Sequence, residues 1–135
     1  MEWLIYTLIS VGLYGLWGFL SKLASRYMDP ASILVYQTVG ALVVGIYVLA
    51  QIGFKPQASA KGIIYSLLLG TTGMAANFFL VKGVSLGKAS TVIVITALYP
   101  IVTIGLVYCF FGESLSMRQW AGIGLGLVAI YLLAS

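Results

Sequence analysis

The chain has 135 residues, of which 61% are apolar and only 7% are charged. A soluble domain usually carries about 25% charged residues, and so short a chain cannot bury this much apolar surface in a water-soluble core. The composition excludes a soluble globular domain, a disordered chain and a collagen-like repeat. It predicts an all-α integral membrane protein.

The charged residues are few and scattered. Seven Lys and Arg face three acids, which gives a net charge of +4. The basic residues stand singly between apolar runs and form no basic stripe, so the pattern predicts no nucleic-acid partner. It favours anchors beside membrane lipid headgroups, and Lys22 and Lys82, which closely follow apolar runs, are expected to reach toward them.

Five apolar segments have about the 20 residues that a membrane span needs. They cover about residues 3–21, 31–52, 62–81, 88–111 and 117–133. The runs are continuous and do not alternate, which disfavours a β-barrel. Their short connections predict antiparallel neighbours within one membrane domain over residues 1–135.

Local signals mark two helix starts and one interruption. Asp29 fits an N-cap with Pro30 at the first helical position, and Ser116 with Gln119 forms a capping-box pattern. Pro100 stands near the middle of the fourth span, where it cannot donate to the carbonyl of Thr96. We expect a kink there, which serves either packing or a transport site.

The loop charges are nearly balanced across the membrane. With five spans, one side holds Lys55, Lys61 and Arg118, and the other holds the remaining four basic residues, Lys22, Arg26, Lys82 and Lys88. An excess of Lys and Arg on one side orients a membrane protein. A difference of one basic residue therefore favours neither orientation strongly. Two interpretations remain. The chain adopts one orientation despite the balance, or it inserts in both orientations and two copies pair antiparallel.

Glycines recur on the first and last spans. Gly12, Gly15 and Gly18 share one face of the first, and Gly122 and Gly126 form a small-xxx-small pair on the fifth. Small residues let helices approach closely in lipid. Packing within the chain explains both sets, and a dimer contact is the alternative for the fifth helix.

The acidic residues, the lack of histidine and the single cysteine argue against a catalytic site. The three acids, Glu2, Asp29 and Glu113, lie at or outside the ends of the spans, which argues against proton-coupled export through a central carboxylate. There is no histidine, and the lone Cys109 is expected to be a packing residue. We therefore expect no enzyme activity, no metal site and no cofactor.

Polar but uncharged side chains remain as candidates for contact with a solute. They are Tyr14, Trp17, Tyr36, Gln37, Asn77, Thr96, Tyr99 and Thr103. Buried amides and hydroxyls in lipid need partners. Two interpretations stand: these groups bond to neighbouring helices, or they line a wet cavity.

An ordered set of short motifs runs through the chain. It includes Leu98-Tyr99-Pro100, Gly112-Glu113-Ser114-Leu115-Ser116, Gln119-Trp120-Ala121-Gly122, and earlier Gly15-Leu16-Trp17-Gly18 and Asp29-Pro30. The sequence closely resembles the five-helix repeat unit of the EamA family in the drug/metabolite transporter superfamily. Members usually carry two such units, inverted relative to each other, around a central path.

The resemblance implies a ten-helix inverted dimer built from two copies of this unit. Carried over from the family, the substrate-path residues are Trp17, Tyr36, Gln37, Asn77, Thr96 and Tyr99, with Pro100 as the helix kink. Glu113 matches the turn glutamate of the family, and its charge is expected to favour the start of the last helix.

We therefore expect a small-metabolite transporter that works by alternating access as an antiparallel homodimer in the prokaryotic plasma (inner) membrane. The apolar and aromatic lining favours an uncharged, zwitterionic or aromatic solute over a strongly charged one. Two alternatives are a non-transporting membrane assembly subunit and one half of a heteromeric transporter.

Overall fold

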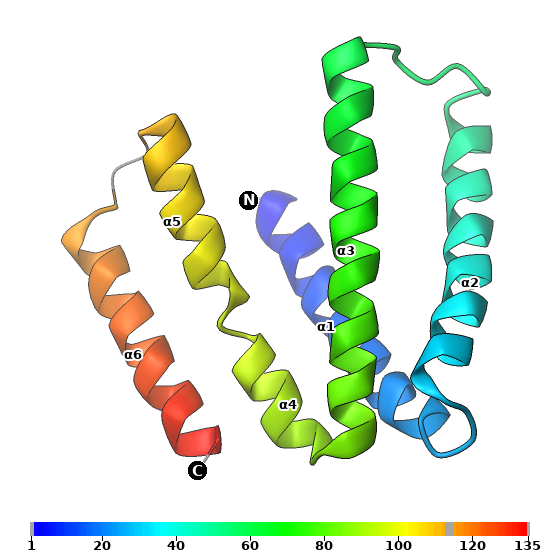
Figure 1. Ribbon diagram of the computed structural model, residues 1–135. Helices are drawn as coiled ribbons and strands as arrows, with labels where there is room; N and C mark the ends of the chain where they lie inside the picture. Colours follow the sequence, from blue (N-terminus) through cyan, green and yellow to red (C-terminus); the bar gives the residue numbers. More distant parts are fainter. Residues whose placement is uncertain (1, 113–114, 135) are drawn as a thin grey trace. The chain divides into compact units, whose positions relative to one another are not determined.

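A computed structural model of the protein describes residues 2–112 and 115–134. In these residues the regular structure is helical throughout: α1 (Glu2–Ala24), α2 (Pro30–Gln51), α3 (Ala60–Leu86), α4 (Ala89–Thr96), α5 (Tyr99–Phe111) and α6 (Met117–Ala134) (Figure 1). The helices group into two compact units, residues 1–86 and residues 87–135. In the first unit α3 packs against both α1 and α2, and in the second α4 packs against α6.

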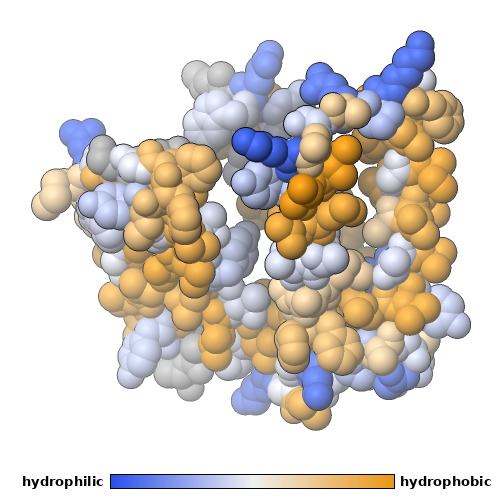
Figure 2. All heavy atoms as spheres, turned by 45° about the horizontal axis from the view of Figure 1, so that its top comes forward, coloured by the Kyte–Doolittle hydropathy of each residue, from blue (hydrophilic) through white to orange (hydrophobic). Residues whose placement is uncertain are grey.

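Four helical segments among the described residues are long and apolar enough to cross a membrane: α1, α2, α3 and the segment Ala89–Phe111 that contains α4 and α5. Hydrophobic residues cover most of the visible helix surface (Figure 2). The predicted all-helical membrane protein is confirmed. The fifth span stays a prediction, because α6 is not among these four segments.

The start of α2 has the predicted cap. The Asp29 carboxylate accepts hydrogen bonds from the backbone N–H groups of Ala31 at 2.9 Å and Ser32 at 3.0 Å, and from the Ser32 hydroxyl at 2.6 Å. Pro30 takes the first helical position, where its missing N–H costs nothing. These contacts satisfy backbone donors that every helix start leaves unpaired.

The end of α2 closes through two backbone hydrogen bonds of the Schellman type. The N–H of Phe54 donates to the carbonyl of Leu49 at 3.0 Å, and the N–H of Gly53 donates to the carbonyl of Ala50 at 3.0 Å. Gly53 has a φ of 63°, a left-handed conformation that glycine adopts without a side-chain clash. This geometry ends the helix before the polar loop.

The third helix is longer than the predicted span. The sequence predicts an end near Val81, whereas α3 continues to Leu86 and carries Lys82 on its exposed surface. No proline interrupts this stretch, so one more helical turn forms beyond the apolar run. The extra turn contributes Val84, which is buried.

The second unit shows the predicted cap of the last helix. The N–H of Ser116 donates to Oε1 of Gln119 at 2.8 Å, and the N–H of Gln119 donates to the Ser116 hydroxyl at 3.4 Å. The capping box is confirmed. Upstream, Gly112 ends α5 with a φ of 66°. Glu113, whose predicted role was at this turn, lies outside the described residues.

The prediction of close packing at the glycine faces is confirmed for Gly18 and stays a prediction for the other glycines. Gly18 is buried. In contrast, within its own unit a methyl group built at Gly12, Gly15, Gly122 or Gly126 meets no described atom within 4 Å. Because no helix of the same unit approaches these four positions, they face lipid or atoms beyond their unit.

Candidate solute path

The helices of the first unit are packed tightly at one end only. Buried residues from all three helices meet there, and we call this set the closed end: Gly18 and Ser21 of α1, Ile33 of α2, and Val81 and Val84 of α3. Val81 is 0% exposed and Val84 is 1% exposed. In Figure 1, α1 and α2 approach α3 at this end and separate from it toward the other.

Polar contacts within α1 and between α1 and α3 lie at the closed end. The Ser21 hydroxyl donates to the carbonyl of Trp17 at 2.9 Å, and the Lys22 ammonium donates to the carbonyl of Val84 at 2.9 Å. The Val84 carbonyl belongs to the last turn of α3, where helix carbonyls lack helical donors and a positive charge is favourable. Lys22 thus contacts another helix, and its predicted extension to lipid headgroups stays a prediction.

Three predicted path residues lie one turn away from the closed end. Trp17 precedes the buried Ser21 by four residues, Gln37 follows Ile33 by four, and Asn77 precedes Val81 by four. Residues four apart share one helix face, so each candidate continues the packed stripe of its helix. All three side chains are half-buried.

These three residues also lie at a similar depth. Trp17 stands seven residues before the end of α1, Gln37 seven after the start of α2, and Asn77 nine before the end of α3. At 1.5 Å per residue these positions are about 10, 10 and 13 Å from the closed-end termini of their helices. Counted from these termini, the three residues therefore differ in level by about 3 Å.

Tyr36 does not share this position. Its side chain is 66% exposed, because the residue next to Gln37 points about 100° away around the helix. The structure therefore brings Trp17, Gln37 and Asn77 to one level on the packed stripes, and it places Tyr36 outside them.

A shallow hollow follows α1 above Trp17. It is lined by Ser10, Leu13, Tyr14 and Trp17. Ser10 was not singled out from the sequence, although its spacing to Leu13, Tyr14 and Trp17 follows the helical pattern of one face. The Ser10 hydroxyl donates to the carbonyl of Tyr6 at 2.9 Å, so its oxygen remains available as an acceptor.

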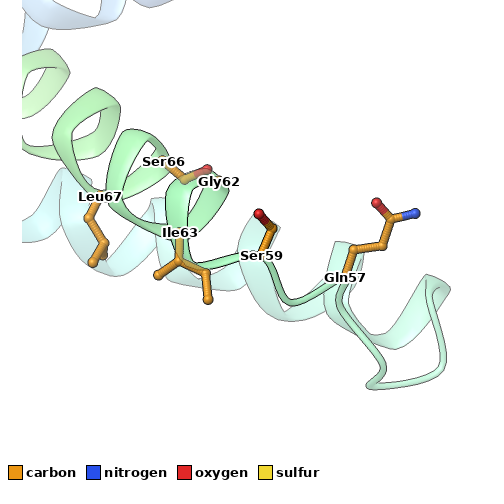
Figure 3. A pocket seen from close by; sticks show the side chains of 6 residues that line it. All are labelled: Gln57, Ser59, Gly62, Ile63, Ser66 and Leu67. Atoms are coloured by element: carbon orange, nitrogen blue, oxygen red, sulfur yellow. The ribbon is translucent and has the colours of Figure 1, made fainter.

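A second hollow lies at the opposite end of the first unit, at the start of α3. Gln57 and Ser59 of the preceding loop line it together with Gly62, Ile63, Ser66 and Leu67 (Figure 3). Ser66 points away from Ile63 and Leu67 (Figure 3). This hollow contains no predicted path residue.

The second unit contains the predicted disturbance at Pro100. The sequence predicts a kink in one helix, whereas the structure has two separate helices there. α4 ends at Thr96 and α5 begins at Tyr99. The N–H of Leu98 donates to the carbonyl of Ile95 at 3.1 Å, and the N–H of Ile101 donates to that of Leu98 at 3.0 Å. These bonds span three residues and tighten the turn, and the missing N–H of Pro100 leaves the Thr96 carbonyl without its helical donor.

The two predicted path residues of the second unit flank this interruption. Thr96 is exposed, and its hydroxyl donates to the carbonyl of Val92 at 2.8 Å. Tyr99 is 64% exposed. Both residues border the two-residue turn, Ala97 and Leu98, that separates α4 from α5 within an apolar span.

The family comparison covers the whole chain, since the EamA-like transporter family matches residues 1–135. The chain belongs to the EamA-like transporter family. The resemblance seen in the motifs is thereby confirmed, and this EamA-like protein is an integral membrane transporter of the drug/metabolite type. No curated protein and no solved structure matches the chain.

Proposed function

We propose that this EamA-like protein moves a small metabolite across the prokaryotic plasma membrane by alternating access, as an antiparallel homodimer. The observation that carries the proposal is the packing of the first unit, which is closed at one end and open at the other. Half-buried Trp17, Gln37 and Asn77 lie at the boundary between the two. A transporter that exposes its site to one side at a time needs such an end.

The near balance of loop charges supports the antiparallel pairing. Three basic residues are predicted on one side of the membrane and four on the other, so neither orientation is strongly favoured. Two copies in opposite orientations would place closed ends at both faces of the membrane. Rocking of the copies about a shared midplane site would then open them in turn.

Orientation in the native membrane is the first test of this pairing. Single cysteines are placed in the loop 53–61 and at the C-terminus, in a Cys109→Ser background, and labelled from outside with a membrane-impermeant thiol reagent. Labelling of both sites to about half of the permeabilised level supports dual insertion. Labelling of one site alone contradicts the antiparallel homodimer and points to a heteromeric half-transporter.

Transport itself is tested separately in proteoliposomes, with a panel of radiolabelled neutral and aromatic metabolites. Thr96→Val and Gln37→Leu are expected to lower uptake without lowering the amount of protein in the membrane. Absence of flux for every solute, together with a stable complex with another membrane protein, would instead support an assembly subunit.

A further inference from the structure

Two carboxamide side chains in the first unit lack hydrogen-bond partners. Gln37 on α2 and Asn77 on α3 are both half-buried. Within residues 2–112 and 115–134, neither side chain makes a hydrogen bond, although the lysine and serine of the closed end beside them do. No buried side-chain nitrogen or oxygen of the described residues lacks a partner, so the amide atoms of Gln37 and Asn77 lie at the surface of the unit, where a solute can pair with them.

The two amides lie on helices that pack against each other. α2 packs against α3, and each amide lies one turn beyond a buried residue of the closed end, Ile33 for Gln37 and Val81 for Asn77. Their depths, counted from the closed end, differ by about 3 Å. Both residues therefore lie at the same boundary, where the packed helices begin to separate.

A carboxamide presents a carbonyl acceptor and an amino donor in one plane. An ammonium group offers donors only and leaves the amide N–H groups unpaired, whereas a carboxylate offers acceptors only and leaves the amide carbonyl unpaired. An edge with an N–H donor beside a carbonyl acceptor satisfies both, as in the two-bond pairing of Asn or Gln with adenine.

The positions of the charged residues in the first unit also favour an uncharged partner for the two amides. Glu2 and Asp29 stand at helix ends, and Lys22 lies five residues beyond Trp17 toward the closed end, where its ammonium contacts the Val84 carbonyl. No acidic or basic side chain of the described residues occupies the helices at the level of the two amides. A charged group would be desolvated there without a counter-charge.

We propose that Gln37 and Asn77 form a subsite for an uncharged amide-type edge, such as that of a carboxamide, lactam or ureide. The subsite rests on the proposed function, since it assigns a solute class to the same path. It makes the hydrogen-bonding pattern of the solute, and not its charge, the basis of selection.

Binding is tested with three probes of similar shape, by saturation-transfer NMR titration of the full chain in lipid nanodiscs. Benzamide carries the donor and the acceptor, methyl benzoate the acceptor alone, and benzylammonium donors alone. Empty nanodiscs correct for partition into lipid. We expect saturable binding of benzamide above the empty-disc signal, and binding of the other two weaker by about tenfold. Equal binding of all three, or no binding of benzamide, would overturn the subsite.

Matched variants connect the binding to the two amides. Gln37→Met and Asn77→Leu are each expected to weaken benzamide binding about threefold to tenfold. Gln51→Met, at the exposed end of the same helix α2, should leave it unchanged. If Asn77→Leu does not fold, the nearly isosteric Asn77→Asp replaces it, and it is also expected to weaken benzamide binding. Wild-type binding in the amide variants would contradict the assignment.

The flux assay separates the failure of this subsite from the failure of transport. Saturable, amide-dependent benzamide binding without solute flux would leave the subsite standing and contradict the transport mechanism. Flux of some other solute without amide-dependent binding would contradict the subsite and leave transport standing.

Discussion

The ammonium group of Lys22 donates a 2.9 Å hydrogen bond to the backbone carbonyl of Val84, and the two residues are 62 positions apart in the sequence. The bond joins the end of α1 to the last turn of α3. It supplies a charged donor to a carbonyl that has no helical partner, beside a valine side chain that is 1% exposed. The closed end thus combines apolar packing with a charged contact between two helices.

Replacement of Lys22 by Met removes this donor and keeps the length of the side chain. A hydrogen bond from a charged group contributes about 1.5–3 kcal/mol, so we expect Lys22→Met to lower the unfolding free energy by about that amount. Lys82→Met is the matched control, because Lys82 is exposed on α3. Thermal unfolding in detergent measures both, and equal losses would show that the Val84 contact has no specific role.

Pro100→Ala restores an N–H that can donate to the carbonyl of Thr96. We expect α4 and α5 to join into a straighter helix, because the helical hydrogen bond re-forms and the clash of the proline ring disappears. Spin labels at Ser90 and Leu106 report this as a longer and narrower distance distribution in pulsed electron paramagnetic resonance. Pro56→Ala, in the loop before α3, should leave that distribution unchanged, and an unchanged distribution in Pro100→Ala would contradict the prediction.

Alanine substitutions at Gly53, next to α2, and at Gly45, within α2, are expected to change the stability in opposite directions. Gly53 has a φ of 63°, so Gly53→Ala strains the turn and is expected to cost about 1 kcal/mol. Gly45 lies inside the helix with free space for a methyl group, so Gly45→Ala is expected to stabilise by about 0.5–1 kcal/mol. Thermal unfolding of the two variants in the same detergent tests the pair, and a shift of the same sign in both would be inconsistent with this account.

The cap of α2 makes stability depend on pH. The hydrogen bond from the Ser32 hydroxyl, followed by those from the backbone N–H groups of Ser32 and Ala31, lowers the pKa of Asp29. A carboxyl with a lowered pKa in the folded state adds stability above its unfolded pKa and loses it as the pH falls through the folded pKa. We expect the Tm to fall between about pH 5 and pH 3. Asp29→Asn, which cannot titrate, should flatten that part of the profile, and identical profiles would refute the linkage.

Local features of this fold could be predicted because their partners are close in sequence. The caps at Asp29 and Ser116 involve residues two or three positions away, and the disturbance at Pro100 follows from one missing N–H. The membrane class followed from the apolar composition, and the family followed from ordered motifs and was confirmed over residues 1–135.

Only the tertiary structure decided which faces of the helices are inside. In lipid both the inward and the outward face of a helix are apolar, so hydropathy does not distinguish the half-buried Gln37 from the exposed Tyr36. The contact between Lys22 and Val84 likewise depends on how α1 meets α3, which no local pattern encodes. The sequence by itself determined the helices and their caps, whereas packing between helices decided the closed end and the level at which Trp17, Gln37 and Asn77 lie.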